Sequence, residues 1–154
     1  MSEKPFRPCV GLALLDSTGR ALIGERIDTP NAWQMPQGGI DENEDIETAA
    51  FRELQEEVGL TQAHATILGI MPEKLRYSMP HHLTHLWDGK YAGQEQTWVA
   101  LRFTGQDSDV KLDLHGQPEF SQWKWATLDD MLGLIVPFKR DTYTKVIGFL
   151  RAIA

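Results

Sequence analysis

Residues 38–60 read GGIDENEDIETAAFRELQEEVGL. Turn residues open this stretch, and the apolar spacing of its second half predicts a helix over residues 45–58. Gly59 follows where a residue with positive φ commonly ends a helix, and Asp41 or Asn43 is expected to cap the beginning. One flank of such a helix is apolar and can pack on a sheet, whereas the other flank is acidic.

The acidic flank brings three carboxylates together. Glu53, Glu56 and Glu57 fall within an arc of about 100°, because a helix turns by 100° per residue. Two ionised carboxylates about 4 Å apart repel by roughly 4 kcal/mol at an effective dielectric constant of 20, so three of them require a cation or protonation. Oxygen ligands at this density are typical of Mg²⁺ or Mn²⁺ sites. Judged by spacing alone, a solvated helix face is the alternative.

The same stretch accounts for the net charge of the chain. The 154 residues include 22 acids and 15 bases, which gives −7, and residues 41–57 hold eight of the acids but only one base, Arg52. The remainder therefore balances 14 acids with 14 bases. With 42% apolar residues, the chain is expected to fold as a single domain over residues 1–154, which excludes a disordered polyanion. It has no basic excess of the kind that grips a DNA duplex along its length.

The remaining segments predict a mixed sheet with helices on its faces, an α/β architecture. Six segments have the composition of strands: 9–15, 20–27, 33–35, 65–71, 97–103 and 120–125, of which the first two should pair as a hairpin. Residues 77–96 are expected to form a long polar loop.

Two helices are expected near the C-terminus. Thr127 with Asp130 three residues later predicts a short capped helix. A last helix has an apolar stripe at i, i+3, i+4 and i+7, which is expected to pack in the core and consists of Tyr143, Val146, Ile147 and Leu150.

Composition also bears on cellular location. No stretch approaches the roughly 20 apolar residues of a membrane span, and residues 1–8 have no apolar run of signal-peptide length. The single cysteine, Cys9, cannot form an intramolecular disulfide and is expected to have no chemical role. These features predict a cytoplasmic protein with no membrane partner.

The spacing within residues 38–60 resembles the signature of the Nudix hydrolases, Gly-x5-Glu-x7-Arg-Glu-U-x-Glu-Glu-x-Gly-U, where U is aliphatic. Gly38, Glu44 and Arg52 occupy the first defined positions, and residues 53–60 complete the signature. From average residue usage, such a match arises by chance on the order of once in 10⁹ starting points. The resemblance implies the Nudix fold, an α/β/α sandwich around a mixed β-sheet, and hydrolysis of a pyrophosphate linkage between a nucleoside and another group.

Further blocks resemble the bacterial RNA pyrophosphohydrolases and the related dinucleoside polyphosphate hydrolases. These blocks are residues 33–40, 75–77, 93–98, 118–120 and 137–140. The resemblance implies metal-dependent hydrolysis of the 5′-triphosphate end of RNA to a 5′-monophosphate with release of pyrophosphate, which would initiate mRNA decay. Asymmetric hydrolysis of dinucleoside polyphosphates such as diadenosine tetraphosphate is the alternative substrate class. A catalytically inactive Nudix domain that binds RNA or a nucleotide is the alternative from a different class.

By the same resemblance, two or more Mg²⁺ or Mn²⁺ ions are expected. The implied metal ligands are Glu53, Glu56, Glu57, Glu119 and a backbone carbonyl at Gly38, which with Gly39 would form a tight turn. Glu53 is also the candidate for the base that deprotonates the attacking water. Arg52, four residues before Glu56, is expected to orient the carboxylates, and Glu44 is expected to support the loop.

The implied substrate-binding residues are Arg7, Arg26, Tyr77, Gln94, Gln96, Phe138 and Lys139. Arg7 and Lys139 are expected to contact the 5′ phosphates, and Arg26 and Phe138 to stack on a base. A core position beside Pro137 is the alternative for Phe138.

Three histidines distinguish this chain from those relatives. His81 and His82 stand where the relatives tend to carry Lys or Arg, and His85 follows. We interpret this segment as a phosphate-facing loop whose charge varies near neutral pH, because histidine titrates there. The sequence leaves open whether an activating protein partner exists.

Overall fold

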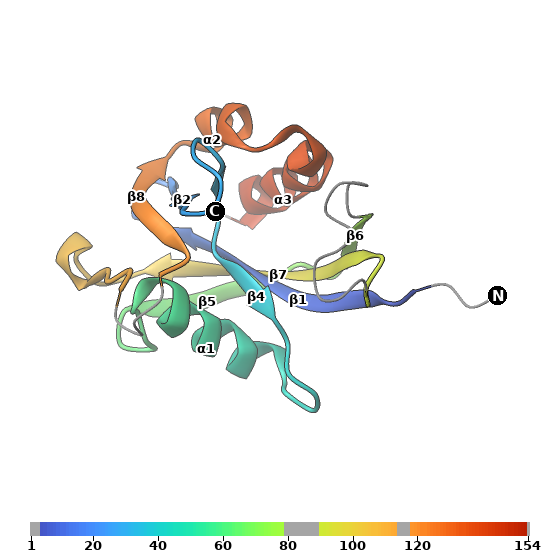
Figure 1. Cartoon of the computed structure of the whole chain (residues 1–154). Helices are drawn as coiled ribbons and strands as arrows, with labels where there is room; N and C mark the ends of the chain where they lie inside the picture. The colour runs from blue at the N-terminus through green and yellow to red at the C-terminus, as the bar shows by residue number, and fades with distance from the viewer. Residues whose placement is uncertain (1–3, 79–89, 114–117, 154) are drawn as a thin grey trace.

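The computed structural model describes residues 4–78, 90–113 and 118–153. The strands are β1 (Phe6–Leu15), β2 (Ala21–Arg26), β3 (Trp33–Gln34), β4 (Gln37–Gly39), β5 (Ala65–Ile70), β6 (Leu75–Ser78), β7 (Gly93–Phe103) and β8 (Phe120–Ala126). The helices are α1 (Ile46–Val58), α2 (Leu128–Leu134) and α3 (Arg140–Ile153), with short 3₁₀ turns at Asp107–Asp109 and Pro137–Lys139. Helix α1 covers one face of the sheet, and α2 and α3 cover the other (Figure 1). The predicted α/β/α arrangement is confirmed.

The sheet is built around β1. Its main path runs β3-β2-β1-β7-β5, while β4 pairs with β1, β6 with β7 and β8 with β2. Strands β1 and β7 run parallel over ten residue pairs, from Phe6 beside Gly93 to Leu15 beside Arg102. The predicted hairpin of β1 with β2 is confirmed. Antiparallel and parallel pairs meet in β1, so the sheet is mixed, as predicted.

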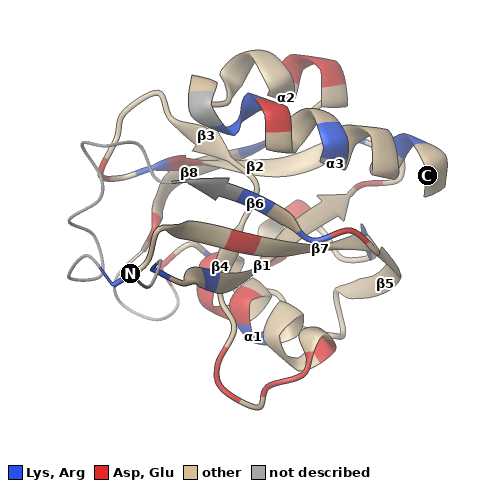
Figure 2. Ribbon diagram, turned by 90° about the vertical axis from the view of Figure 1, so that its right-hand side faces the viewer, with Lys and Arg blue, Asp and Glu red and all other residues tan. Residues whose placement is uncertain are grey.

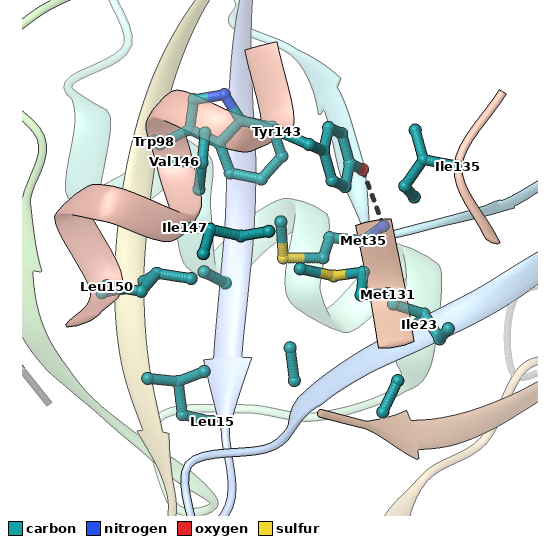
Figure 3. Packing of buried hydrophobic residues seen from close by; sticks show 14 of the residues in the cluster. Leu15, Ile23, Met35, Trp98, Met131, Ile135, Tyr143, Val146, Ile147 and Leu150 are labelled. Atoms are coloured by element: carbon teal, nitrogen blue, oxygen red, sulfur yellow. Dashed lines mark hydrogen bonds between the residues drawn. The ribbon is translucent and has the colours of Figure 1, made fainter. Parts of the chain in front are cut away.

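Alternation along β1 divides the core between the two faces. Leu12 and Leu14 belong to the cluster under α1, whereas Ala13 and Leu15 belong to the cluster under α2 and α3. The predicted stripe of α3 is buried in the second cluster, where Figure 3 shows it with Trp98. Because both faces are apolar, the sheet is covered on both sides.

The ends of α1 follow the predicted signals in part. Gly59 has φ 73° and ends the helix, as predicted. The capping prediction was wrong, because the cap is Asp45, whose carboxylate accepts a 2.7 Å hydrogen bond from the backbone N–H of Thr48. Asn43 instead adopts a positive φ of 64° in the preceding loop. None of the described helices is long and apolar enough to cross a membrane.

Two strands lie where the sequence predicts none. Strand β4 pairs antiparallel with β1, with Gly39 beside Cys9 and Gly38 beside Val10, so the predicted tight turn at these glycines was wrong. Strand β6 and the first residues of β7 replace the two ends of the predicted loop over 77–96. The middle of that loop, with His81, His82 and His85, lies outside the described residues. Pairing with distant strands forms these elements, and local composition carries no signal for such pairing.

Gly59→Ala should lower the free energy of unfolding by at least about 1 kcal/mol, because a β-carbon is strained at positive φ. It would also lie 2.8 Å from the β-carbon of Lys111. Urea denaturation measures the effect. Gly148→Ala is the control, since Gly148 lies in α3 and a β-carbon added there meets no atom within 4 Å beyond the backbone of its own helix. The free energy of unfolding of the control should rise by up to about 1 kcal/mol. Equal changes in both variants would contradict the assignment of Gly59 as a helix-ending residue with positive φ.

Candidate active site

Strand β4 separates two groups of functional side chains. Gly38 faces the carboxylate of Glu53, and a β-carbon at residue 38 would collide with that carboxylate. Gly39 faces the opposite way, where a β-carbon would lie 2.5 Å from the Arg7 guanidinium. The two glycines therefore allow close approach of an acid on one side and a base on the other.

Arg52 organises the acids of α1. Its guanidinium donates to Glu44 twice at 2.7 Å and to Glu53 at 2.7 Å, and lies 3.3 Å from Glu56. It also donates to the backbone carbonyl of Gly39 at 2.8 Å, which ties α1 to the end of β4. The Arg52 guanidinium lowers the pKa of Glu44 to about 2. Glu44 is thus an ion-pair partner that supports the loop, and Arg52 contacts the carboxylates it was expected to orient.

Glu57 lies outside this network. Its side chain is buried, and its Oε2 is the one buried side-chain polar atom without a hydrogen-bond partner among the described residues. Burial, followed by repulsion from Glu119 and Glu53, raises the pKa of Glu57 to about 9. Burial also raises the pKa of Glu53. A divalent cation bound beside this unpartnered oxygen would neutralise the negative charge of Glu57 and of the neighbouring acids.

These side chains line one pocket of about 730 Å³. The lining residues are Arg7, Cys9, Arg26, Asp28, Gln34, Gln37, Gly38, Gly39, Arg52, Glu53, Gln55, Glu56, Glu57, Gln94 and Glu119. Figure 2 shows the acidic residues gathered on α1 and on the loop that precedes it. The implied ligands Glu53, Glu56, Glu57, Glu119 and Gly38 thus share one pocket with Arg7, Arg26 and Gln94.

The acids do not form a closed cage. Within residues 4–78, 90–113 and 118–153, no three His, Cys, Asp or Glu side chains are close enough together to enclose a metal ion. Glu56 and Glu119 are exposed at the pocket, whereas Glu53 and Glu57 are buried at its wall. An oxygen-only donor set with open positions suits a hard divalent cation that also binds water and phosphate. The residues present fit such an ion, and the orphaned oxygen of Glu57 is the observation that supports this fit.

Other implied substrate-binding residues lie behind the pocket or outside the described part. Gln96 is buried and contacts Gln37 and Gln94 instead of lining the pocket. Lys139 is also buried, and its Nζ donates to Oε1 of Gln34 at 3.0 Å. The backbones of Tyr77 and Phe138 are described, but their side chains are not.

Five pocket residues were missed by the sequence analysis. Asp28 accepts two hydrogen bonds from Arg26, at 2.8 and 2.6 Å, and so fixes the plane of that guanidinium. Gln34, Gln37, Gln55 and Cys9 also line the pocket. A local signal was available for Gln37, which directly precedes Gly38, and for Gln55, which lies between Glu53 and Glu56 on α1. Cys9 and Gln34 reach the pocket through strand pairing, and Asp28 through its hydrogen bonds to Arg26. Burial raises the pKa of the Cys9 thiol to about 11.

Known proteins resemble this chain over nearly its full length. A family model described as NUDIX domain matches residues 5–146. A protein named RNA pyrophosphohydrolase from Novosphingobium aromaticivorans is 47% identical over 96% of this chain and 93% of its own. One of the same name from Rhodospirillum rubrum is 46% identical over 97% and 90%.

Solved structures agree on the fold. The dihydroneopterin triphosphate pyrophosphohydrolase of E. coli superposes with a TM-score of 0.74 at 20% identity, covering 92% of this chain and 97% of its own. The Ap4A hydrolase of C. elegans superposes with a TM-score of 0.68 at 24% identity, covering 94% and 98%. At these identities the likeness concerns the fold alone.

Glu57→Gln should flatten the pH dependence of stability in EDTA. The folded protein holds a proton on Glu57 up to about pH 9, whereas an ordinary glutamate loses it near 4.5. The free energy of unfolding of the wild type should therefore fall as pH rises between these values, by up to roughly 1.4 kcal/mol per unit. Urea denaturation at pH 5.5 and 8.5 measures the slope.

Glu47→Gln is the matched control, because Glu47 is exposed in the first turn of α1. Adding Mg²⁺ at pH 8.5 should raise the Tm of the wild type and of this control, but should raise that of Glu57→Gln much less. Identical pH slopes in the two variants would contradict the assignment of a buried, orphaned carboxylate.

Proposed function

The chain belongs to the NUDIX domain family, and on this basis we propose that it hydrolyses the 5′-triphosphate end of RNA to a 5′-monophosphate and pyrophosphate. The observation that supports this substrate is the similarity of almost the whole chain to proteins named RNA pyrophosphohydrolase. Such a reaction on RNA ends would initiate mRNA decay, with the cytoplasm as the proposed place of action.

The acid side of the pocket would hold the metal. Glu53, Glu56, Glu57, Glu119 and the backbone at Gly38 are the proposed ligands for two or more Mg²⁺ or Mn²⁺ ions. Divalent cations there would neutralise phosphate oxygens and lower the pKa of a bound water. Arg52 keeps Glu53 and Glu56 in place through its hydrogen bonds. Because burial raises the pKa of Glu53, this carboxylate is a better proton acceptor than an exposed glutamate, which suits the proposed general base.

The basic side would hold the RNA end. Arg7 lines the pocket beside Gly39 and is proposed to contact the phosphate chain. Arg26 donates two hydrogen bonds to Asp28 along one edge of its guanidinium, which leaves the faces of the guanidinium available for stacking on a base. Phe138 is the proposed second stacking partner. Burial lowers the pKa of Lys139 to about 8, so it still carries a proton at pH 7 for its proposed role near the phosphates.

Glu53→Gln and Glu56→Gln should each lower kcat at least about 100-fold, because each removes a carboxylate that no neighbour replaces. The assay is release of pyrophosphate from 5′-triphosphorylated RNA in Mg²⁺. Glu47→Gln, on the same helix but exposed away from the pocket, should keep wild-type turnover. Near wild-type turnover in both pocket variants would refute the site assignment.

Parallel assays of two substrates test the proposed substrate class. The wild-type protein should hydrolyse 5′-triphosphorylated RNA with a higher kcat/KM than diadenosine tetraphosphate, and EDTA should abolish both activities. A preference for the dinucleotide would replace the proposed substrate with the alternative one. Absence of turnover on either substrate in Mg²⁺ and in Mn²⁺ would support an inactive binding domain.

A further inference from the structure

Three glutamines behind and beside the pocket form one hydrogen-bonded chain that starts at a buried tryptophan. Trp98 Nε1 donates to Oε1 of Gln96 at 3.0 Å. Gln96 Nε2 donates to Oε1 of Gln37 at 2.6 Å and to Oε1 of Gln94 at 3.0 Å. Gln94, Gln96 and Trp98 alternate along β7 and therefore share one face of the sheet, whereas Gln37 comes from β4.

The chemistry of the indole fixes the direction of every bond in this chain. An indole nitrogen can only donate, so Gln96 must present its oxygen to Trp98 and its NH₂ group to the other two glutamines. Those two must then accept through their oxygens. Gln37 and Gln94 both line the pocket. Each of their oxygens already accepts a hydrogen bond from Gln96, whereas their NH₂ groups are free to donate to a ligand.

The amide oxygen of Gln34 is also engaged by a donor of the protein, through a contact independent of Trp98. Its Oε1 accepts from Nζ of Lys139, another group that only donates. Gln34 also lines the pocket, so three neutral amides there have their oxygens engaged by donors of the protein. An ionised phosphate oxygen only accepts hydrogen bonds, so it is the kind of ligand atom that the NH₂ groups of these three glutamines would bind.

Trp98 is held in one position. It is fully buried, and a β-carbon at Gly11 would collide with its ring. On another side the Tyr143 ring packs edge-on against it, with centroids 5.5 Å apart. The Tyr143 hydroxyl in turn accepts a 2.9 Å hydrogen bond from the backbone N–H of Met35, as Figure 3 shows. The indole N–H therefore cannot turn away from Gln96 without moving the core.

We propose that Trp98 is a positioning residue that makes Gln37 and Gln94 hydrogen-bond donors to the phosphate chain of the substrate. The parallel register places Gln94 beside Arg7, so the amide donors and the guanidinium would serve adjacent phosphate oxygens. This inference rests on the proposed function for the identity of the substrate, but its physical content is the affinity of the pocket for a phosphate chain.

Trp98→Phe tests the proposal, because it keeps an aromatic ring and removes the N–H. Gln96 can then rotate its amide, and Gln37 and Gln94 lose their fixed polarity. We expect KM for 5′-triphosphorylated RNA to rise about five- to tenfold, with kcat within about twofold of the wild type. Trp125→Phe is the control, since Trp125 donates to Asp107 away from the pocket and its loss should leave both constants unchanged.

A double-mutant cycle separates positioning from loss of core packing. Gln96→Leu should raise KM as Trp98→Phe does, and the double variant should show no further rise, because both changes break the same chain. Additive effects on KM, or a KM for Trp98→Phe equal to that of Trp125→Phe, would overturn the proposal.

Binding of inorganic tripolyphosphate keeps the test independent of turnover. In Mg²⁺, calorimetry should show about five- to tenfold weaker binding to Trp98→Phe than to the wild type. In ¹⁵N-labelled wild-type protein, the side-chain NH₂ resonances of Gln37 and Gln94 should shift on binding, and in Trp98→Phe they should shift less. If the wild type binds tripolyphosphate but does not hydrolyse triphosphorylated RNA, the proposed function fails alone. Equal tripolyphosphate affinity in all variants overturns the positioning role alone.

Discussion

The guanidinium of Arg52 joins the acidic helix α1 to the loop and strand that precede it. It contacts the carboxylate of Glu44 in the loop, the carboxylate of Glu53 on α1 and the carbonyl of Gly39 at the end of β4. A single cation therefore links these three segments, and it lies between two negatively charged side chains. Two carboxylates about 4 Å apart repel by roughly 4 kcal/mol at an effective dielectric constant of 20, and Arg52 offsets part of this repulsion. Glu57 is beyond its reach and keeps an orphaned, buried oxygen. The helix thus carries a permanent cation, Arg52, beside some of its acids, whereas the buried oxygen of Glu57 has no such partner. A metal ion bound in the pocket would supply positive charge at Glu57.

The strand in front of α1 gives the pocket its two chemical sides. Successive residues of a strand point in opposite directions, so Gly38 admits the carboxylate of Glu53 on one side of β4 and Gly39 admits Arg7 on the other. Acids that would hold cations and donors that would hold phosphate are thereby only one strand apart. The parallel pairing of β1 with β7 then places Gln94 beside Arg7. A phosphate chain between these sides would meet bound cations on the acidic side and Arg7 with the amide donors on the other. The net charge of −7 does not oppose its binding once cations are held.

Caps and apolar periodicity predicted the elements whose conformation is specified by residues close in sequence. The helix over residues 45–58 agrees with α1, and Thr127 caps α2 through the N–H of Asp130, as predicted. Such caps and periodicities depend on neighbours in sequence. Strand β4 was missed because its Gln-Gly-Gly sequence has no preference for a strand, and only its pairing with β1 makes it one. The acids of α1 and Arg52 were identified from their spacing and from the family signature. Gln34 and Gln37 were not, because the side chains that they contact, Lys139 and Gln96, are distant in sequence.

The order of residues alone was enough to specify the acidic helix, the charge that must be neutralised there, and the family to which the chain belongs. The side chains at positions 52, 53, 56 and 57 are set on one helix by 100° steps, and no other part of the chain needs to be known to place them together. The folded structure decided which acid is orphaned and which way the amides of Gln34, Gln37 and Gln94 point. Both depend on burial and on partners remote in sequence: Glu57 lacks a partner because packing encloses it, and Gln37 offers its NH₂ group because Trp98, 61 residues away, can only donate.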